Sequence, residues 1–162
     1  MILNRQRQVR VSVRELERFL TRALRLVSVP SDAIGISLVT NAQIAKWNRA
    51  YRGKNSATDV LSFPADLAKR AKRNAKSGHK RNAASRHGTD AAIRSSDPYL
   101  GDIAIAPAVA RKNARRFGRT LGDEMRILIL HGILHLMGYD HETDSGQMNR
   151  RDARLRRALD LA

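Results

Sequence analysis

Residues 127–139 form the longest apolar stretch of this 162-residue chain, and two histidines, His131 and His135, interrupt it. The stretch is too short and too polar to cross the hydrocarbon core of a membrane, which requires about 20 apolar residues. It is long enough for a buried helix, in which residues four positions apart lie on the same face. The sequence therefore predicts a helix over residues 123–137 with both imidazoles on one face.

A third histidine follows at a spacing that indicates a metal site. Gly138 allows the chain to turn back after the helix, and His141 completes the pattern H-x3-H-x5-H. The chain has no cysteine, which excludes disulfides, thiolate ligands and cysteine nucleophiles. Three imidazoles with a fourth position open are typical of catalytic zinc, whereas a lone histidine is more often packed or solvated. We therefore expect His131, His135 and His141 to bind one Zn²⁺ per chain, although Ni²⁺ or Co²⁺ would accept the same nitrogens.

The same histidine spacing occurs in the peptidase motif H-E-x-x-H-x-x-G-x-x-H, where the glutamate is the general base. Position 132 of this chain is glycine. The ligand spacing favours a metal hydrolase, while the missing carboxylate argues against this class of peptidase.

Basic residues dominate the charge of the chain. Its 31 lysines and arginines exceed its 15 acidic residues and give a net charge of +16, and 24 of the basic residues are arginine. This balance favours a polyanionic partner, nucleic acid first and a membrane surface second. The N-terminal segment carries Arg5, Arg7 and Arg10 and lacks the apolar run of a secretion signal. We expect a cytoplasmic protein that does not bind membranes.

One segment differs in composition from the rest. Residues 66–97 hold nine basic and three acidic residues and almost no large apolar side chain. Because such a segment cannot build a core, we expect a mobile basic insertion within a single domain that spans residues 1–162. The other 130 residues keep 22 basic and 12 acidic residues, a net charge of +10, so the charge argument does not depend on the insertion.

Hydrophobic periodicity predicts the remaining elements. Helices are expected over residues 11–27, 41–52, 108–117 and 123–137 and around Met148, Leu155 and Leu159; strands are expected over 33–39, 60–63 and 100–106, with a weaker one within 2–11. In the second helix, Ile44, Trp47 and Tyr51 share a spacing typical of a core-facing side. We expect one α/β (α+β) domain in which a small mixed β-sheet packs with about five helices, the metal site lying on a central helix and the turn after it.

Four motifs together resemble the YbeY family of bacterial zinc endoribonucleases and rRNA maturation factors. They are YRGK at 51–54, TDVLSFP at 58–64, LGDI at 100–103 and HGILHLMGYDHE at 131–142. The resemblance covers most of the chain, and the motifs occur in the family's order. The insertion at 66–97 departs from the family, whose members usually have a much shorter connection there.

The resemblance implies a function and a set of site residues. It implies a metal-dependent, single-strand-specific endoribonuclease that acts in 3′-end maturation of 16S rRNA, ribosome biogenesis and ribosome quality control. It assigns zinc to His131, His135 and His141, and it matches Arg52 to a functionally important arginine in the RNA groove. The implied partners are the 16S rRNA precursor, the small ribosomal subunit and its assembly factors.

Several alternatives stay open at this point. From the residues alone, Arg52 is equally compatible with a solvent-facing position after a helix end. Asp59 and Asp102 are compatible with orienting a ligand histidine, with proton transfer or with a turn. Trp47 and Tyr51 are expected in the core rather than as stacking surfaces for bases. A ribosome-assembly RNA-binding protein with structural zinc, and a metallopeptidase, remain alternative functions. The oligomeric state is open.

Overall fold

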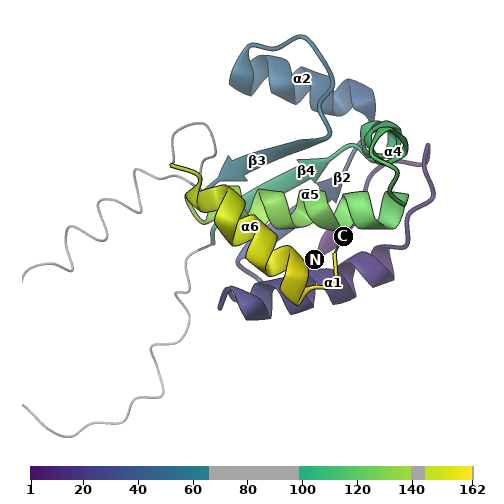
Figure 1. Cartoon of the computed structure of the whole chain (residues 1–162). Coiled ribbons are helices and arrows are strands. Elements are labelled where there is room, and N and C mark those ends of the chain that lie inside the picture. Colours follow the sequence, from purple (N-terminus) through teal and green to yellow (C-terminus); the bar gives the residue numbers. More distant parts are fainter. Residues whose placement is uncertain (66–98, 140–144, 162) are drawn as a thin grey trace, which may run out of the picture.

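The computed structural model describes residues 1–65, 99–139 and 145–161 (Figure 1). Four strands and five helices occur in these ranges: β1 (Ile2–Asn4), α1 (Val13–Leu26), β2 (Ile34–Leu38), α2 (Asn41–Arg52), β3 (Val60–Pro64), β4 (Gly101–Ile105), α4 (Pro107–Arg116), α5 (Leu121–Leu136) and α6 (Gln147–Ala158). This confirms the α/β class, the small mixed sheet and the five helices. The segment 66–97, expected to be a mobile insertion, lies outside the described residues.

The four strands form one sheet in the order β1-β2-β4-β3. β1 and β4 both run parallel to β2, while β3 pairs antiparallel with β4, with Leu61 opposite Ala104. β3 is therefore an edge strand of the sheet. Its neighbour β4 lies between two strands that run in opposite directions.

The main core lies between one face of the sheet and the helices α1, α5 and α6 (Figure 1). Alternate residues of β2 and β4 face it because successive side chains of a strand point to opposite sides. Ile36, Ile103 and Ile105 are almost fully buried there. Ten of the sixteen residues of α5 are buried, so α5 is the central helix that the apolar stretch predicts.

A smaller core covers part of the opposite face. Ile44 of α2 packs there with Leu61 and Ala104, and Trp47 and Phe63 lie at its margin. α2 lies over the β3 side of the sheet, and its C-terminal end stands beside β3. This placement leaves a groove next to β3, which is described below.

Two expectations for the elements need correction. The weak strand expected within residues 2–11 is limited to Ile2–Asn4, since Gln6 exchanges side-chain hydrogen bonds with the Val9 backbone and so turns the chain away from the sheet. Tyr51 does not face the core: it is 71% exposed, while Ile44 on the same helix is fully buried. The Tyr51 ring contacts Phe63 on β3, with 4.8 Å between the ring centroids, so Tyr51 lies on β3 with most of its surface in water.

None of the helices in the described ranges is long and apolar enough to span a membrane.

Candidate active site

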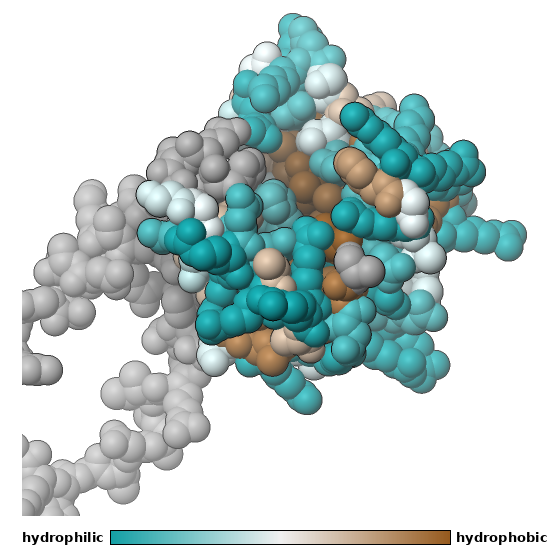
Figure 2. Space-filling model, viewed as in Figure 1, coloured by the Kyte–Doolittle hydropathy of each residue, from teal (hydrophilic) through white to brown (hydrophobic). Residues whose placement is uncertain are grey.

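A groove of about 720 Å³ lies between the C-terminal end of α2, the β3 edge and the C-terminal half of α5. Figure 2 shows this face of the molecule hollowed, with apolar side chains inside the hollow and hydrophilic side chains around its rim. The groove walls come from three segments far apart in the sequence: 51–52, 58–64 and 131–139. The polar side chains that line the groove include Tyr51, Arg52, Asp59, Ser62, His131, His135 and Tyr139. The fold therefore joins three of the four sequence motifs in one cavity.

His131 and His135 face the groove together from α5. Their Nε2 atoms are 3.0 Å apart and their rings are nearly perpendicular, at 82°. Two imidazoles bound to zinc at about 2.0–2.1 Å in tetrahedral geometry would hold their nitrogens about 3.3 Å apart. The spacing of the two nitrogens thus fits a shared divalent metal, and neutral imidazole is a good ligand for zinc.

The chain leaves α5 at Gly138, three residues before the third expected ligand, His141. Gly138 follows the end of α5 with φ +94°, a conformation that L side chains rarely adopt, so a glycine is required where the chain leaves the helix. His141 lies outside the described residues. In the ranges that the structure describes, no third histidine or carboxylate joins His131 and His135 in a metal-binding group.

Gly132 has a structural role between the two histidines. A Cβ atom at this position would lie 2.8 Å from Cδ1 and 2.9 Å from Cγ2 of Ile103 on β4. The glycine allows α5 to lie close against the sheet, and it faces Ile103 rather than the groove. A glutamate at position 132 would point at Ile103. It could not reach the groove as the base of a peptidase unless α5 shifted on the sheet.

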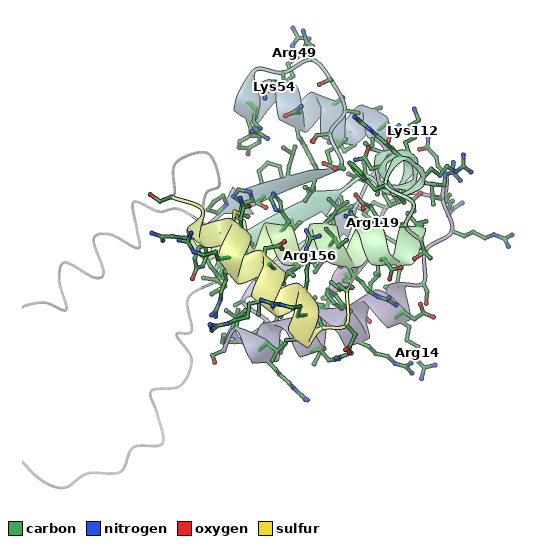
Figure 3. All side chains as sticks on the ribbon, in the orientation of Figure 1. Arg14, Arg49, Lys54, Lys112, Arg119 and Arg156 are labelled. Atoms are coloured by element: carbon green, nitrogen blue, oxygen red, sulfur yellow. The ribbon has the colours of Figure 1, made fainter. Side chains whose placement is uncertain are left out.

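Arg52, the last residue of α2, lines the same groove as the histidine pair. Gly53 ends the helix in the left-handed region, at φ +68°, and the buried Asn48 donates a hydrogen bond from Nδ2 to the Ser56 carbonyl at 2.8 Å. These features fix the path of the segment that leads from Arg52 to β3. By contrast, Arg49 projects away from the body of the molecule (Figure 3).

Asp59 lines the groove, but its carboxylate is engaged in structural hydrogen bonds. Asn113 donates to Oδ2 at 2.8 Å, and the Val60 backbone N–H donates to Oδ1 at 2.9 Å. These bonds hold the start of β3 against α4. The turn role thus describes Asp59 better than ligand orientation or proton transfer.

Asp102 lies on the other face of the sheet from α5, because its neighbour Ile103 is the residue that contacts Gly132. Its Oδ1 accepts a hydrogen bond from the Tyr99 hydroxyl at 2.7 Å. Asp102 therefore does not orient either described histidine.

Sequence reasoning missed Asn48 and the exposure of Tyr51. An asparagine four residues after the core residue Ile44, on the same helix face, is a signal for a buried polar contact. The exposure of Tyr51 had no such signal, since its helix spacing matches that of the buried Ile44 and its surroundings depend on how α2 packs on β3.

The family model described as Endoribonuclease YbeY matches residues 1–160. This chain belongs to the YbeY endoribonuclease family. The match includes all of the groove residues, and the family description supports an RNA-cleaving hydrolase.

Individual YbeY relatives agree with the family assignment. The chain is 35% identical over 161 residues to "Endoribonuclease YbeY" of Koribacter versatilis, a match that covers 99% of this chain and 86% of the relative. It is 36% identical over 148 residues to the protein of the same name from Solibacter usitatus, covering 90% and 78% of the two chains. It is 33% identical over 135 residues to that of Helicobacter pylori, covering 83% and 77%.

A solved structure shares the fold of this chain. The solution structure of a Thermotoga maritima protein superposes with a TM-score of 0.54 and 24% identity, covering 98% of this chain and 89% of the other. At this identity the comparison bears on the fold alone.

Proposed function

We propose that this chain is a zinc-dependent, single-strand-specific endoribonuclease that matures the 3′ end of 16S rRNA in the cytoplasm and takes part in ribosome biogenesis and quality control. The substrate would be the 16S precursor, met on the small ribosomal subunit together with assembly factors. The observation that carries the proposal is the shared groove: the histidine pair and Arg52 line one cavity in a chain of an endoribonuclease family.

In this proposal His131, His135 and His141 would hold zinc. The metal would supply Lewis-acid chemistry that assists phosphodiester cleavage. The apolar packing around α5 fixes the backbone that carries the two imidazoles before any ligand binds, because Ile133 and Leu134 between them are fully buried. Preorganisation of this kind lowers the cost of assembling the site.

Arg52 acts on the substrate phosphate in this proposal. Negative charge grows on the nonbridging phosphate oxygens as the phosphodiester bond breaks, and a guanidinium can donate two parallel hydrogen bonds to them. Arg52 is the arginine that lines the groove, and the Gly53 turn and the Asn48 contact fix the backbone beside it. Asp59 keeps its structural hydrogen bonds to Asn113 and Val60 and has no assigned step.

The test is cleavage of a single-stranded rRNA-precursor fragment by the full chain and by matched variants purified identically. His135→Ala should lose cleavage and should retain less zinc per chain by elemental mass spectrometry. Arg52→Ala should keep its zinc but lower kcat/KM by about 10²- to 10³-fold, the range seen when a charge-stabilising donor is removed. Arg49→Ala, a cation on the same helix that does not line the groove, is the control and should cut at the wild-type rate.

Other outcomes would select a different function. Equal cutting by wild type and His135→Ala would separate the nuclease activity from the histidine site and overturn the proposal. RNA binding without cutting by any variant, together with zinc-dependent folding, would favour an assembly protein with structural zinc.

A further inference from the structure

Tyr51 is an exposed aromatic residue at the rim of the groove. It is 71% exposed although it occupies a helix position whose spacing matches the core residue Ile44. An exposed aromatic side chain loses the favourable free energy that burial of its ring would give. Such residues are enriched where a protein meets a partner. The neighbouring residue in the sequence is Arg52, which lines the groove with the histidine pair.

The Tyr51 ring is exposed but supported by other aromatic rings. Its centroid is 4.8 Å from that of Phe63 on β3, with the rings inclined at 68°. Phe63 in turn meets Trp47 at 5.9 Å and 84°. Such edge-to-face contacts restrict the tyrosine ring, because aromatic pairs prefer this geometry to others. The ring is thus held in place while most of its surface faces water.

Tyr51 also stands between two cavities. Tyr51 and Phe63 line the groove that contains the histidines. Both also line a second hollow of about 400 Å³ on the sheet face that points away from α5. Arg5, Ser37 and Asp102 also line this second hollow. An extended polymer that leaves the groove past Tyr51 would enter this second hollow, which Arg5 also lines.

We propose that Tyr51, backed by Phe63 and Trp47, is the stacking surface for one base of single-stranded RNA, and that Arg5 contacts a phosphate of the same strand beyond it. The inference rests on the proposed endoribonuclease function and extends its substrate path to the second hollow. RNA fits this surface because every base presents a flat face to an aromatic ring and the phosphates match the arginines on either side. The chain's net charge of +16 favours the same occupant.

The test measures binding of a short single-stranded RNA to the full chain by fluorescence anisotropy over a series of salt concentrations. A gel run after each titration confirms that the RNA is intact. Tyr51→Ala should weaken binding by about 5- to 150-fold, the range for loss of one stacked base, while Tyr51→Phe keeps the wild-type affinity. Phe117→Ala removes another exposed aromatic residue, which lines neither hollow, and should bind as wild type does.

The salt dependence separates stacking from charge. Tyr51→Ala should leave the slope of log K against log salt unchanged, because a stacked base releases no counterion. Arg5→Ala should reduce that slope by about 0.7, the value for one phosphate contact on a single strand. A series of RNAs, each with one abasic position, should show one position at which wild type loses affinity and Tyr51→Ala does not.

The possible failures are distinguishable. Wild-type affinity in Tyr51→Ala, with the wild-type chain still binding and cutting RNA, would overturn the stacking role and leave the proposed function standing. A wild-type chain that neither binds nor cuts the RNA would overturn both. A loss of affinity in Tyr51→Phe equal to that in Tyr51→Ala would also reject stacking, because the hydroxyl group would then be the important feature.

Discussion

The hydroxyl of Tyr99 donates a hydrogen bond to the Asp102 carboxylate on the sheet face away from α5. Burial, the hydrogen bond to Asp102 and the negative charge of Asp102 together raise the pKa of Tyr99 to about 12. All three effects favour the neutral phenol. The pair explains why an aspartate of the LGDI motif has a fixed position without any part in the histidine site.

The first prediction concerns the ionisation of this tyrosine. Tyr99 should ionise near pH 12, and Asp102→Asn should lower its pKa, since the amide removes the negative charge that opposes the phenolate. The measurement is the ultraviolet absorbance of phenolate against pH, with Tyr99→Phe subtracted to isolate the residue. A Tyr99 pKa at the ordinary value near 10 in the unmodified chain would contradict the interpretation.

The same shift makes stability depend on pH in a defined direction. The pKa of Tyr99 is higher in the folded chain than in the unfolded chain, so its contribution is fully present below about pH 10. That contribution is lost as the pH rises from about 10 to about 12. The difference in unfolding free energy between wild type and Tyr99→Phe should therefore be constant below this window and shrink within it.

At the scale of elements, the contact of α5 with β4 places the histidine pair. Gly132 lies against the Ile103 side chain at a separation that leaves no space for a Cβ atom. The two histidines flank this glycine on one helix, so the depth at which α5 sits on the sheet also sets the depth of both imidazoles in the groove.

The second prediction tests that contact. Gly132→Ala should destabilise the fold, because overpacking costs about 1–3 kcal/mol and the better helix propensity of alanine returns only about 1 kcal/mol. Gly122→Ala in the same helix is the matched control: its Cβ would meet only Thr120 Oγ1 at 3.7 Å, so it should be neutral or stabilising. Thermal unfolding followed by circular dichroism gives both effects.

The control for the cause of the Gly132 effect is a double-mutant cycle with Ile103→Ala. Removing most of the Ile103 side chain should reduce the cost of Gly132→Ala, since the two sites are in contact and their effects are then not additive. Additive effects, or a Gly132→Ala variant as stable as wild type, would show that the helix adjusts freely on the sheet.

Sequence patterns predicted most of the elements because each depends on local chemistry. The amphipathic spacing of Leu16, Leu20 and Leu24 indicated α1, and the Thr40 cap and the Gly53 turn indicated the ends of α2. The exposure of Tyr51 was not predictable in this way. Its spacing on the helix is that of a core residue, but the packing of α2 on the sheet leaves it 71% exposed.

The arrangement of the site was likewise only partly predictable. The spacing of His131 and His135 predicted their common face, which the 3.0 Å separation of their Nε2 atoms confirms. Their meeting with Arg52 depends on the strand order β1-β2-β4-β3, which is a long-range pairing that no local pattern contains. The ligand role of His141, and zinc itself, stay predictions.

At the scale of the whole molecule, positive charge is spread over the surface rather than confined to the groove. Arg14 on α1 and Lys112 on α4 extend in different directions (Figure 3). Other cations are paired: Arg119 Nη1 contacts Glu124 Oε2 at 3.1 Å, and Arg156 Nε on α6 contacts Asp152 Oδ2 at 2.6 Å. A field of this kind attracts a polyanion from many directions, while in the proposed function the groove would select the part of it that is cut.

The final prediction separates these two contributions by deleting residues 66–97. The deletion removes nine basic and three acidic residues and lowers the net charge from +16 to +10, while the motifs that form the groove stay in the chain. If the segment neutralises RNA phosphates, the slope of log K against log salt should fall by about 0.7 for each phosphate that is no longer neutralised on single-stranded RNA, and affinity should decrease most at low salt. Cleavage at saturating RNA should continue, because Arg52 and the histidine pair lie outside the deleted segment.

An unchanged salt slope would show that the segment does not contribute to RNA affinity. Loss of cleavage at saturating RNA in a folded deletion variant would instead assign it a part in the reaction itself.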